Sequence, residues 1–148
     1  MPKHENNGAC LKCLEIKNKY PNFHEPLWDW FVGVQKSVQD FHISCAGRGE
    51  EDQEALFYKL ATKAHWTKSA HNWGCALDTF FLVPGSNVLW PRGKYDSLKN
   101  MGRIPAWLQW YGEPGCTFPE LPHFEVRNWR SMRDLNQLTL CVKPTGAV

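Results

Sequence analysis

The sequence predicts an α+β domain with a small antiparallel sheet flanked by helices. Helical and strand-like segments alternate without the regular strand–helix–strand order of a parallel sheet. Residues 75–83 are apolar on both faces apart from one aspartate, as in a central buried strand, and residues 26–40 place apolar side chains at helical spacing. No repeat or flexible linker divides the chain. We therefore expect residues 1–148 to form a single domain, with 1–25 as an N-terminal arm or short helix and 26–148 as its core.

The predicted elements of the first half follow in order. A helix over residues 26–40 begins near a proline, whose missing N–H costs nothing in a first turn. A short strand is expected over 41–45. A second helix, over 50–64, has carboxylates at its start and lysines near its end, which suits the helix dipole. The central strand over 75–83 ends at a turn over 84–87.

The second half has shorter predicted elements. Residues 92–111 predict a helix that breaks at a glycine and a proline and then resumes for a turn or two. Residues 112–122, with three prolines, indicate a loop. A strand is expected over 123–126, a closing helix or turn over 128–138, and a last short strand over 139–142.

Composition excludes several classes of protein. Hydrophobic residues make up 43% of the chain and charged residues 22%, which excludes a disordered tail or a collagen-like fibre. The net charge of +2 does not require a nucleic acid as partner. No segment reaches the about 18 apolar residues that cross a membrane, and the start of the sequence lacks the apolar stretch of a secretory signal. We expect the six cysteines to be free thiols of a protein made in a reducing cytosol.

Residues 69–78, SAHNWGCALD, place a histidine and a carboxylate seven positions apart. On an uninterrupted strand, this odd spacing would put His71 and Asp78 on opposite faces. A loop or bulge over 72–74 would bring them to one face, and the small residues between them leave space for an ion or a substrate backbone. A carboxylate in an apolar strand needs a metal ion or another cation as its partner.

A second pair lies in residues 119–125, PELPHFE. Glu120 precedes His123 by three residues, and the proline between them disfavours a helix, so the segment is extended or turned. An imidazole and a carboxylate at this spacing can serve as a metal ligand and a neighbouring base. With the first pair, the sequence offers three nitrogen and oxygen ligands and a non-ligand acid, which a catalytic zinc site requires.

The combined pattern resembles the VanY-type zinc D,D-carboxypeptidase family, which also contains the L-alanyl-D-glutamate endopeptidases that serve as bacteriophage endolysins. The resemblance spans about residues 41–130 and rests on His71, Asp78 and the Glu120-x-x-His123 pair. It implies a D,D-carboxypeptidase/hedgehog-like fold with a zinc cleft on the sheet. His71, Asp78 and His123 would bind Zn²⁺, and Glu120 would be the general base that takes a proton from the zinc-bound water.

The resemblance also involves residues upstream of the zinc ligands. Arg48 would act in catalysis by binding a substrate carboxylate or the developing oxyanion, and Gln53, shortly after it, is expected to bind substrate. Ser69 would orient the first histidine or contact substrate. Trp73, which lies between two ligands in the sequence, is expected to lie against substrate. Many endopeptidases of this family have aspartate at the position of Glu120, whereas the carboxypeptidases have glutamate.

The resemblance implies a zinc-dependent peptidase that hydrolyses an amide bond in the peptide stem of peptidoglycan, as a monomeric phage endolysin. The preferred bond is L-alanyl-D-glutamate, and the alternative is a D-alanyl-D-alanine carboxypeptidase on the same scaffold. Without a signal peptide, the protein would be made in the host cytoplasm and would need a separate pore protein to reach the cell wall in the periplasm. No nucleic acid partner and no stable membrane insertion are expected.

A non-enzymatic alternative starts from Cys10-Leu-Lys-Cys13, which has the spacing of half a structural zinc site. The residues that would complete the site are His4, His24 or Cys45. The protein would then be a zinc-stabilised module that binds peptidoglycan without cleaving it. The presence of Glu120 argues against this role, because a binding module has no use for a base.

Overall fold

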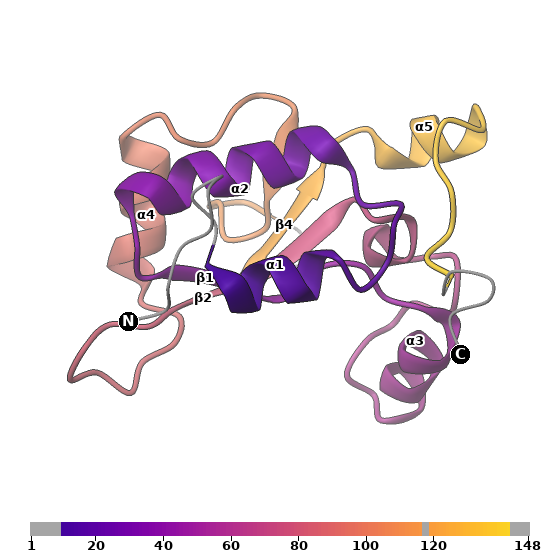
Figure 1. The fold of residues 1–148 in the computed structure, drawn as a ribbon, viewed down its shortest axis with the longest axis horizontal. Coiled ribbons are helices and arrows are strands. Elements are labelled where there is room, and N and C mark those ends of the chain that lie inside the picture. Colours follow the sequence, from indigo (N-terminus) through magenta and orange to yellow (C-terminus); the bar gives the residue numbers. More distant parts are fainter. Residues whose placement is uncertain (1–9, 117–118, 143–148) are drawn as a thin grey trace.

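The computed structural model describes residues 10–116 and 119–142. Its centre is an antiparallel sheet of four strands in the order β1-β2-β4-β3, namely β1 (Phe41–Cys45), β2 (Ala76–Phe81), β4 (His123–Val126) and β3 (Leu108–Trp110). The helices are α1 (Leu11–Lys17), α2 (Glu25–Ser37), α3 (Glu50–Tyr58), α4 (Arg92–Asn100), α5 (Trp129–Asp134) and the 3₁₀ helix η1 (Ala70–Trp73). Helices α3 and α5 lie at the opposite end of the molecule from α4 (Figure 1). The predicted α+β class, the antiparallel sheet and the central position of β2 are confirmed.

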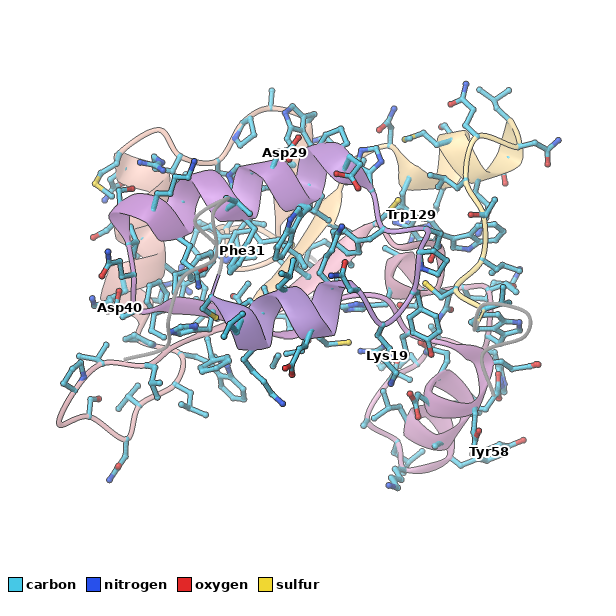
Figure 2. All side chains as sticks on the ribbon, in the orientation of Figure 1. Lys19, Asp29, Phe31, Asp40, Tyr58 and Trp129 are labelled. Atoms are coloured by element: carbon cyan, nitrogen blue, oxygen red, sulfur yellow. The ribbon has the colours of Figure 1, made fainter. Side chains whose placement is uncertain are left out.

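One face of the sheet packs against α2 and α4. Phe31 of α2 is fully buried and points toward the sheet, whereas Asp29 of the same helix points to solvent (Figure 2). The ring of Phe31 lies 5.5 Å from that of Phe41 on β1. Tyr95 of α4 meets Phe81 of β2 edge to face at 4.8 Å. Such aromatic pairs contribute about 0.5–1.5 kcal/mol each beyond the area they bury, so this face stabilises the sheet.

The other face of the sheet carries polar side chains. On β4, His123 and Glu125 alternate with Phe124 and Val126, and all four are buried. Because successive residues of a strand point to opposite faces, His123 and Glu125 lie on the face away from α2 when Phe124 packs toward it. The ring of Phe124 does pack against Trp30 of α2, at 5.1 Å. The hydrophobic core and the polar face are thus the two sides of one thin sheet.

The helix predicted over residues 50–64 is shorter than expected and ends at Tyr58. Leu60 adopts a left-handed conformation with φ of 59°, and the N–H of Ala61 donates to the carbonyl of Leu56 at 2.9 Å. The chain then folds back along α3, because the Gln53 side chain donates to the carbonyl of Ala64 at 2.6 Å. A side chain of the helix therefore binds the segment that was expected to continue it.

Two predictions for the second half were wrong. Residues 108–110 form strand β3 rather than a resumed helix, and they pair with β4 because Leu108 and Trp110 bury their side chains on the core face. Residues 139–142 do not form a strand. The N–H of Cys141 donates instead to the carbonyl of Asn72 at 2.8 Å, which aligns this segment with η1.

The described part of the predicted N-terminal arm belongs to the core. Helix α1 packs against β1, and Cys10, Cys13 and Phe23 are buried in the main hydrophobic cluster. The boundary expected between residues 25 and 26 therefore does not separate an arm from the domain, and α2 itself begins at Glu25. Within the described ranges, no helix is long and apolar enough to cross a bilayer.

Gly74 allows a close approach of two chain segments and provides a test of the fold. Its φ is +69°, and an added Cβ would lie 2.9 Å from the carbonyl oxygen of Asn22 and 3.0 Å from the Cα of Phe23. We expect Gly74→Ala to lower the free energy of unfolding by about 2–4 kcal/mol, from the left-handed backbone and the forced contact together. Urea denaturation measures this loss.

Gly85→Ala is the matched control. Gly85 has a φ of +79°, but an added Cβ there would meet nothing within 4 Å. This substitution therefore has only the backbone penalty of about 1–2 kcal/mol. Equal losses in the two variants would show that the contact with Asn22 and Phe23 has no cost.

Candidate metal centre

The register of the sheet places three chemically reactive side chains in one row. Cys45 of β1 pairs with Asp78 of β2, and Asp78 pairs with His123 of β4. An irregularity in β1 between Ile43 and Cys45 shifts the register, so that Cys45 rather than Ser44 lies opposite Asp78. Directly paired residues project to the same face of a sheet. Cys45, Asp78 and His123 therefore share the polar face.

His71 reaches this row from the 3₁₀ helix η1. The hydroxyl of Ser69 accepts a hydrogen bond from the N–H of His71 at 3.3 Å, and the side chain of Asn72 accepts one from the N–H of Ser69 at 3.2 Å. This capping box fixes the start of the turn, and the left-handed Gly74 ends it. The loop or bulge expected over residues 72–74, which brings His71 and Asp78 to one face, is thus a single 3₁₀ turn that ends at Gly74.

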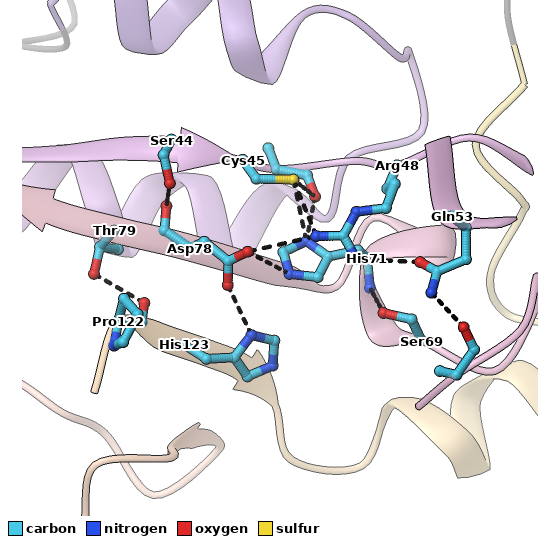
Figure 3. A network of polar contacts seen from close by, with 12 residues as sticks. Ser44, Cys45, Arg48, Gln53, Ser69, His71, Asp78, Thr79, Pro122 and His123 are labelled. Atoms are coloured by element: carbon cyan, nitrogen blue, oxygen red, sulfur yellow. Dashed lines mark hydrogen bonds and ion pairs between the residues drawn. The ribbon is translucent and has the colours of Figure 1, made fainter. Parts of the chain in front are cut away.

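The Asp78 carboxylate lies between two imidazole rings (Figure 3). Oδ2 of Asp78 is 3.2 Å from Nε2 of His71, and Oδ1 is 2.9 Å from Nδ1 of His123. The opposite nitrogen of each ring has an acceptor: Nδ1 of His71 donates to the carbonyl of Ala46 at 2.6 Å, and Nε2 of His123 donates to Glu125 at 2.8 Å. These acceptors fix both tautomers and turn the other nitrogen of each ring toward Asp78, as in histidines that bind metals.

The charges at the centre are strongly coupled. Burial opposes ionisation of all three groups, but their mutual attraction outweighs it. The Asp78 carboxylate raises the pKa of His71 well above its usual value and also raises the pKa of His123, while the two imidazoles lower the pKa of Asp78. A divalent cation bound to the same atoms replaces the protons of the imidazoles. Two imidazole nitrogens and a carboxylate are a ligand set that suits Zn²⁺.

Two further side chains, Glu120 and Cys45, lie close to the ligand atoms of this centre. Ligand atoms of Asp78, Glu120 and His123 all lie within 4.8 Å of one another, and the same holds for Cys45, His71 and Asp78. Glu120 is exposed, so its carboxylate is accessible to water and to substrate. Cys45 lies on the opposite side of Asp78 from His123, next to Arg48.

Arg48 is held beside the centre by a buried amide. Its Nη2 is 3.5 Å from Oδ2 of Asp78 and 3.6 Å from the sulfur of Cys45. Its Nη1 donates to Oε1 of Gln53 at 3.1 Å, and the same oxygen accepts from Asn72 at 3.0 Å. Gln53 is fully buried. The expectation that Gln53 binds substrate is therefore corrected: its side chain has no exposed surface, and it positions Arg48.

A cavity of about 720 Å³ opens onto the centre, and most of the predicted site residues line it. These are Arg48, Ser69, His71, Asp78, Glu120 and His123. Trp73 is absent from the described lining residues. Its indole N–H donates to the carbonyl of Thr67 at 3.0 Å, and its ring packs against the hydrophobic core. The structure thus places Trp73 in the scaffold rather than against substrate.

Three residues of the site were not predicted from the sequence. Glu125 accepts from His123 and also from the indole N–H of Trp129 at 2.8 Å, and the Tyr111 ring meets the His123 ring edge to face at 4.8 Å. Glu125 follows His123 by two positions in a strand, so alternation alone would have placed it on the polar face. The position of Cys45 could not be predicted in this way, because Cys45 lies opposite Asp78 only through the irregularity in β1.

Neither a family model nor a curated protein sequence matches this chain. Among solved structures, the fold is similar to that of the Serratia marcescens L-Ala D-Glu endopeptidase ChiX, with a TM-score of 0.62 at 20% identity, over 84% of this chain and 90% of that chain. A weaker likeness, with a TM-score of 0.47 at 15% identity, links it to the vancomycin resistance D,D-pentapeptidase VanY in complex with Zn(II), over 95% of this chain and 86% of that chain. The first likeness confirms the fold that the sequence resemblance implied.

Glu125→Gln tests the support that β4 gives to the metal centre. The substitution keeps the size of the side chain but removes the negative charge that accepts the N–H of His123. Loss of such a partner weakens metal binding about 10–100-fold, and we expect that effect on Zn²⁺ affinity here. Competition with a chromophoric chelator measures it. Glu51→Gln, on the exposed side of α3, is the control and should leave the affinity unchanged; equal affinities in both variants would contradict the role of Glu125.

Proposed function

We propose that this protein is a zinc-dependent peptidase that hydrolyses an amide bond in the peptide stem of peptidoglycan, with L-alanyl-D-glutamate as the preferred bond. The observation that carries the proposal is the Asp78 carboxylate held between Nε2 of His71 and Nδ1 of His123 beside a cavity of about 720 Å³. The fold shared with an L-Ala D-Glu endopeptidase supports the choice of substrate.

Each site residue has a role in this reaction. His71, Asp78 and His123 would hold Zn²⁺, which would lower the pKa of a bound water molecule toward about 7 and polarise the scissile carbonyl. Glu120 takes a proton from the attacking water and delivers it to the leaving amine. Its carboxylate is exposed and lies within 4.8 Å of ligand atoms of Asp78 and His123. It is therefore close enough to the metal ligands to accept a proton from a water molecule bound there.

Arg48 binds negative charge on the substrate. Its guanidinium lines the cavity, where Gln53 holds Nη1 and Asp78 and Cys45 hold Nη2. The N–H groups that these contacts do not use bind a substrate carboxylate or the developing oxyanion. A guanidinium fixed in this way loses little entropy when it binds a carboxylate. Ser69 acts through the backbone of His71 and also faces the cavity.

A D-alanyl-D-alanine carboxypeptidase on the same scaffold is the second candidate. The residue that favours it is Glu120, because the carboxypeptidases of the family that the sequence resembles have glutamate at this position. Both candidates use the same centre and differ in which bond of the stem peptide lies over it.

We further propose that the protein acts as a monomeric phage endolysin on the periplasmic cell wall, which it reaches through a separate pore protein. The resemblance over residues 41–130 supports this role.

Glu120→Gln separates the base from the metal ligands. The variant retains hydrogen-bonding capacity but cannot take up the proton, so we expect hydrolysis of peptidoglycan fragments to fall by about 10²–10⁴-fold. Zinc content and the urea midpoint should stay at their wild-type values. His123→Ala is the paired variant and should lose activity together with the zinc ion of this centre. Undiminished cleavage by Glu120→Gln would refute the assigned base, and a zinc content in His123→Ala equal to that of the wild type would refute the ligand set.

The identity of the bond is tested by mass spectrometry of purified peptidoglycan digested with and without a zinc chelator. Cleavage of L-alanyl-D-glutamate releases peptides with a new N-terminal D-glutamate, and we expect chelation to abolish them. Release of free D-alanine instead would establish the carboxypeptidase. No product from a protein that has bound zinc would contradict both candidates and favour a binding module.

A further inference from the structure

A second cluster of metal-binding side chains lies outside the cavity, where α1 begins against β1. It consists of Cys10, Cys13 and His42, which are 0%, 1% and 4% exposed. Cys10 and Cys13 flank the first turn of α1, and His42 is the second residue of β1. None of the three lines the cavity of the candidate metal centre. The proposed peptidase reaction does not use them.

The three ligand atoms form a compact triangle. The sulfurs of Cys10 and Cys13 are 3.0 Å apart, and Nδ1 of His42 lies 3.5 Å from the first and 3.6 Å from the second. A single ion placed slightly out of the plane of these atoms lies about 2.0–2.3 Å from each, which is the range of Zn–N and Zn–S bonds. The nearly equal distances from His42 to both sulfurs favour one shared ion over a bond between the sulfurs alone.

Three N–H donors are directed at the sulfurs, which otherwise lie in the hydrophobic core. The backbone N–H of Cys13 is directed at the sulfur of Cys10 at 3.4 Å, and the backbone N–H of Ile43 at that of Cys13 at 3.5 Å. The buried Gln35 amide adds a donor to Cys13 at 3.7 Å. Its orientation is fixed, since its oxygen accepts from the N–H of Cys10 at 2.9 Å and its nitrogen donates to the carbonyl of Phe41 at 2.6 Å. Donors around a sulfur stabilise the thiolate that binds metals, and they oppose the burial that raises the pKa of the Cys13 thiol.

We propose that Cys10, Cys13 and His42 bind a second metal ion, Zn²⁺, which joins α1 to the edge strand β1. Two thiolates and an imidazole are ligands that Zn²⁺ favours, and a small fourth donor such as water completes a tetrahedral site. Because β1 also ends at Cys45 beside the candidate metal centre, this ion anchors the strand at its other end. The site is structural and distinct from the catalytic one.

The structure changes the partner expected for the Cys-x-x-Cys pair. Of the residues considered from the sequence, Cys45 lies beside His71 and Asp78 instead, and His4 is outside the described residues. His24 precedes α2 and belongs to none of the metal-binding groups found among the described residues. The third ligand is His42, brought to the pair by the packing of α1 on β1.

Metal counting in the full chain tests this site. Protein purified with a thiol reductant, saturated with Zn²⁺ and dialysed should contain two zinc ions per chain. The Cys10→Ser/Cys13→Ser variant should contain one, and His123→Ala should also contain one, held at the second site. Cys116→Ser, the same change at a cysteine outside the clusters, should keep two. Wild-type protein with one ion that His123→Ala removes would overturn the second site and leave the proposed function intact.

Cobalt distinguishes the ligands without relying on stability. Co²⁺ bound to thiolates gives a strong sulfur-to-metal absorption band in the near ultraviolet, which histidine and carboxylate ligands do not produce. We expect the band in wild-type protein, in Cys45→Ser and in His123→Ala, and its loss in Cys10→Ser/Cys13→Ser. Loss of the band in Cys45→Ser alone would assign the thiolate to the first centre and overturn the proposal.

Alkylation of the wild-type chain supplies a test that needs no variant. Peptide mapping should show Cys10 and Cys13 protected in the zinc-loaded protein and alkylated after a chelator is added. A peptide that is two hydrogens lighter and resists alkylation in both states would identify a Cys10–Cys13 disulfide. That result, or equal alkylation with and without the chelator, would overturn the metal site.

Discussion

The structure depends on one partly buried carboxylate, that of Asp78, and the cations that surround it. Asp78 is the one charged residue of the central strand β2. Its carboxylate oxygens lie 2.9–3.5 Å from side-chain nitrogens of His71, His123 and Arg48, which balance its charge. An unpaired carboxylate at this partly buried position would destabilise the fold, so its partners must lie close to it. The register of β4, the short turn of η1 and the buried amide of Gln53 behind Arg48 place these partners. The same constraint produces the donor set that suits Zn²⁺.

The two faces of the sheet have different roles: one carries the aromatic packing that stabilises the fold, and the other carries the polar side chains of the candidate metal centre. On one face, aromatic rings of α2 and α4 pack against Phe41, Phe81 and Phe124. On the other face, the alternate positions of the same strands present Asp78, His123 and Glu125 to the cavity. Since both sets are carried by the same short strands, the apolar packing holds the polar side chains in place.

The two candidate metal sites differ in their ligands and in their access to water. The centre at Asp78 has nitrogen and oxygen donors, lies beside a large cavity and has an exposed acid, Glu120, within reach. The cluster at Cys10 has two sulfurs and one nitrogen, and all its side chains are buried. An open site with a neighbouring base suits hydrolysis, whereas a buried site with two thiolates suits structural support. Strand β1 connects them, with His42 near its start and Cys45 at its end.

Local pattern in the sequence predicted the segments that become α2, β1, β2 and β4, and it singled out the His71/Asp78 and Glu120/His123 pairs. The resemblance to a known family joined these pairs into one site. Helical and strand periodicity, and the donor spacing within each motif, depend on neighbours along the chain, so they are readable before folding. Tertiary structure decided the rest. It made residues 108–110 a strand through pairing with β4, ended α3 early and buried Gln53. It also brought His42 to Cys10 and Cys13 across about thirty residues of chain. Those outcomes depend on register and packing between distant segments, and local periodicity carries no information about such contacts.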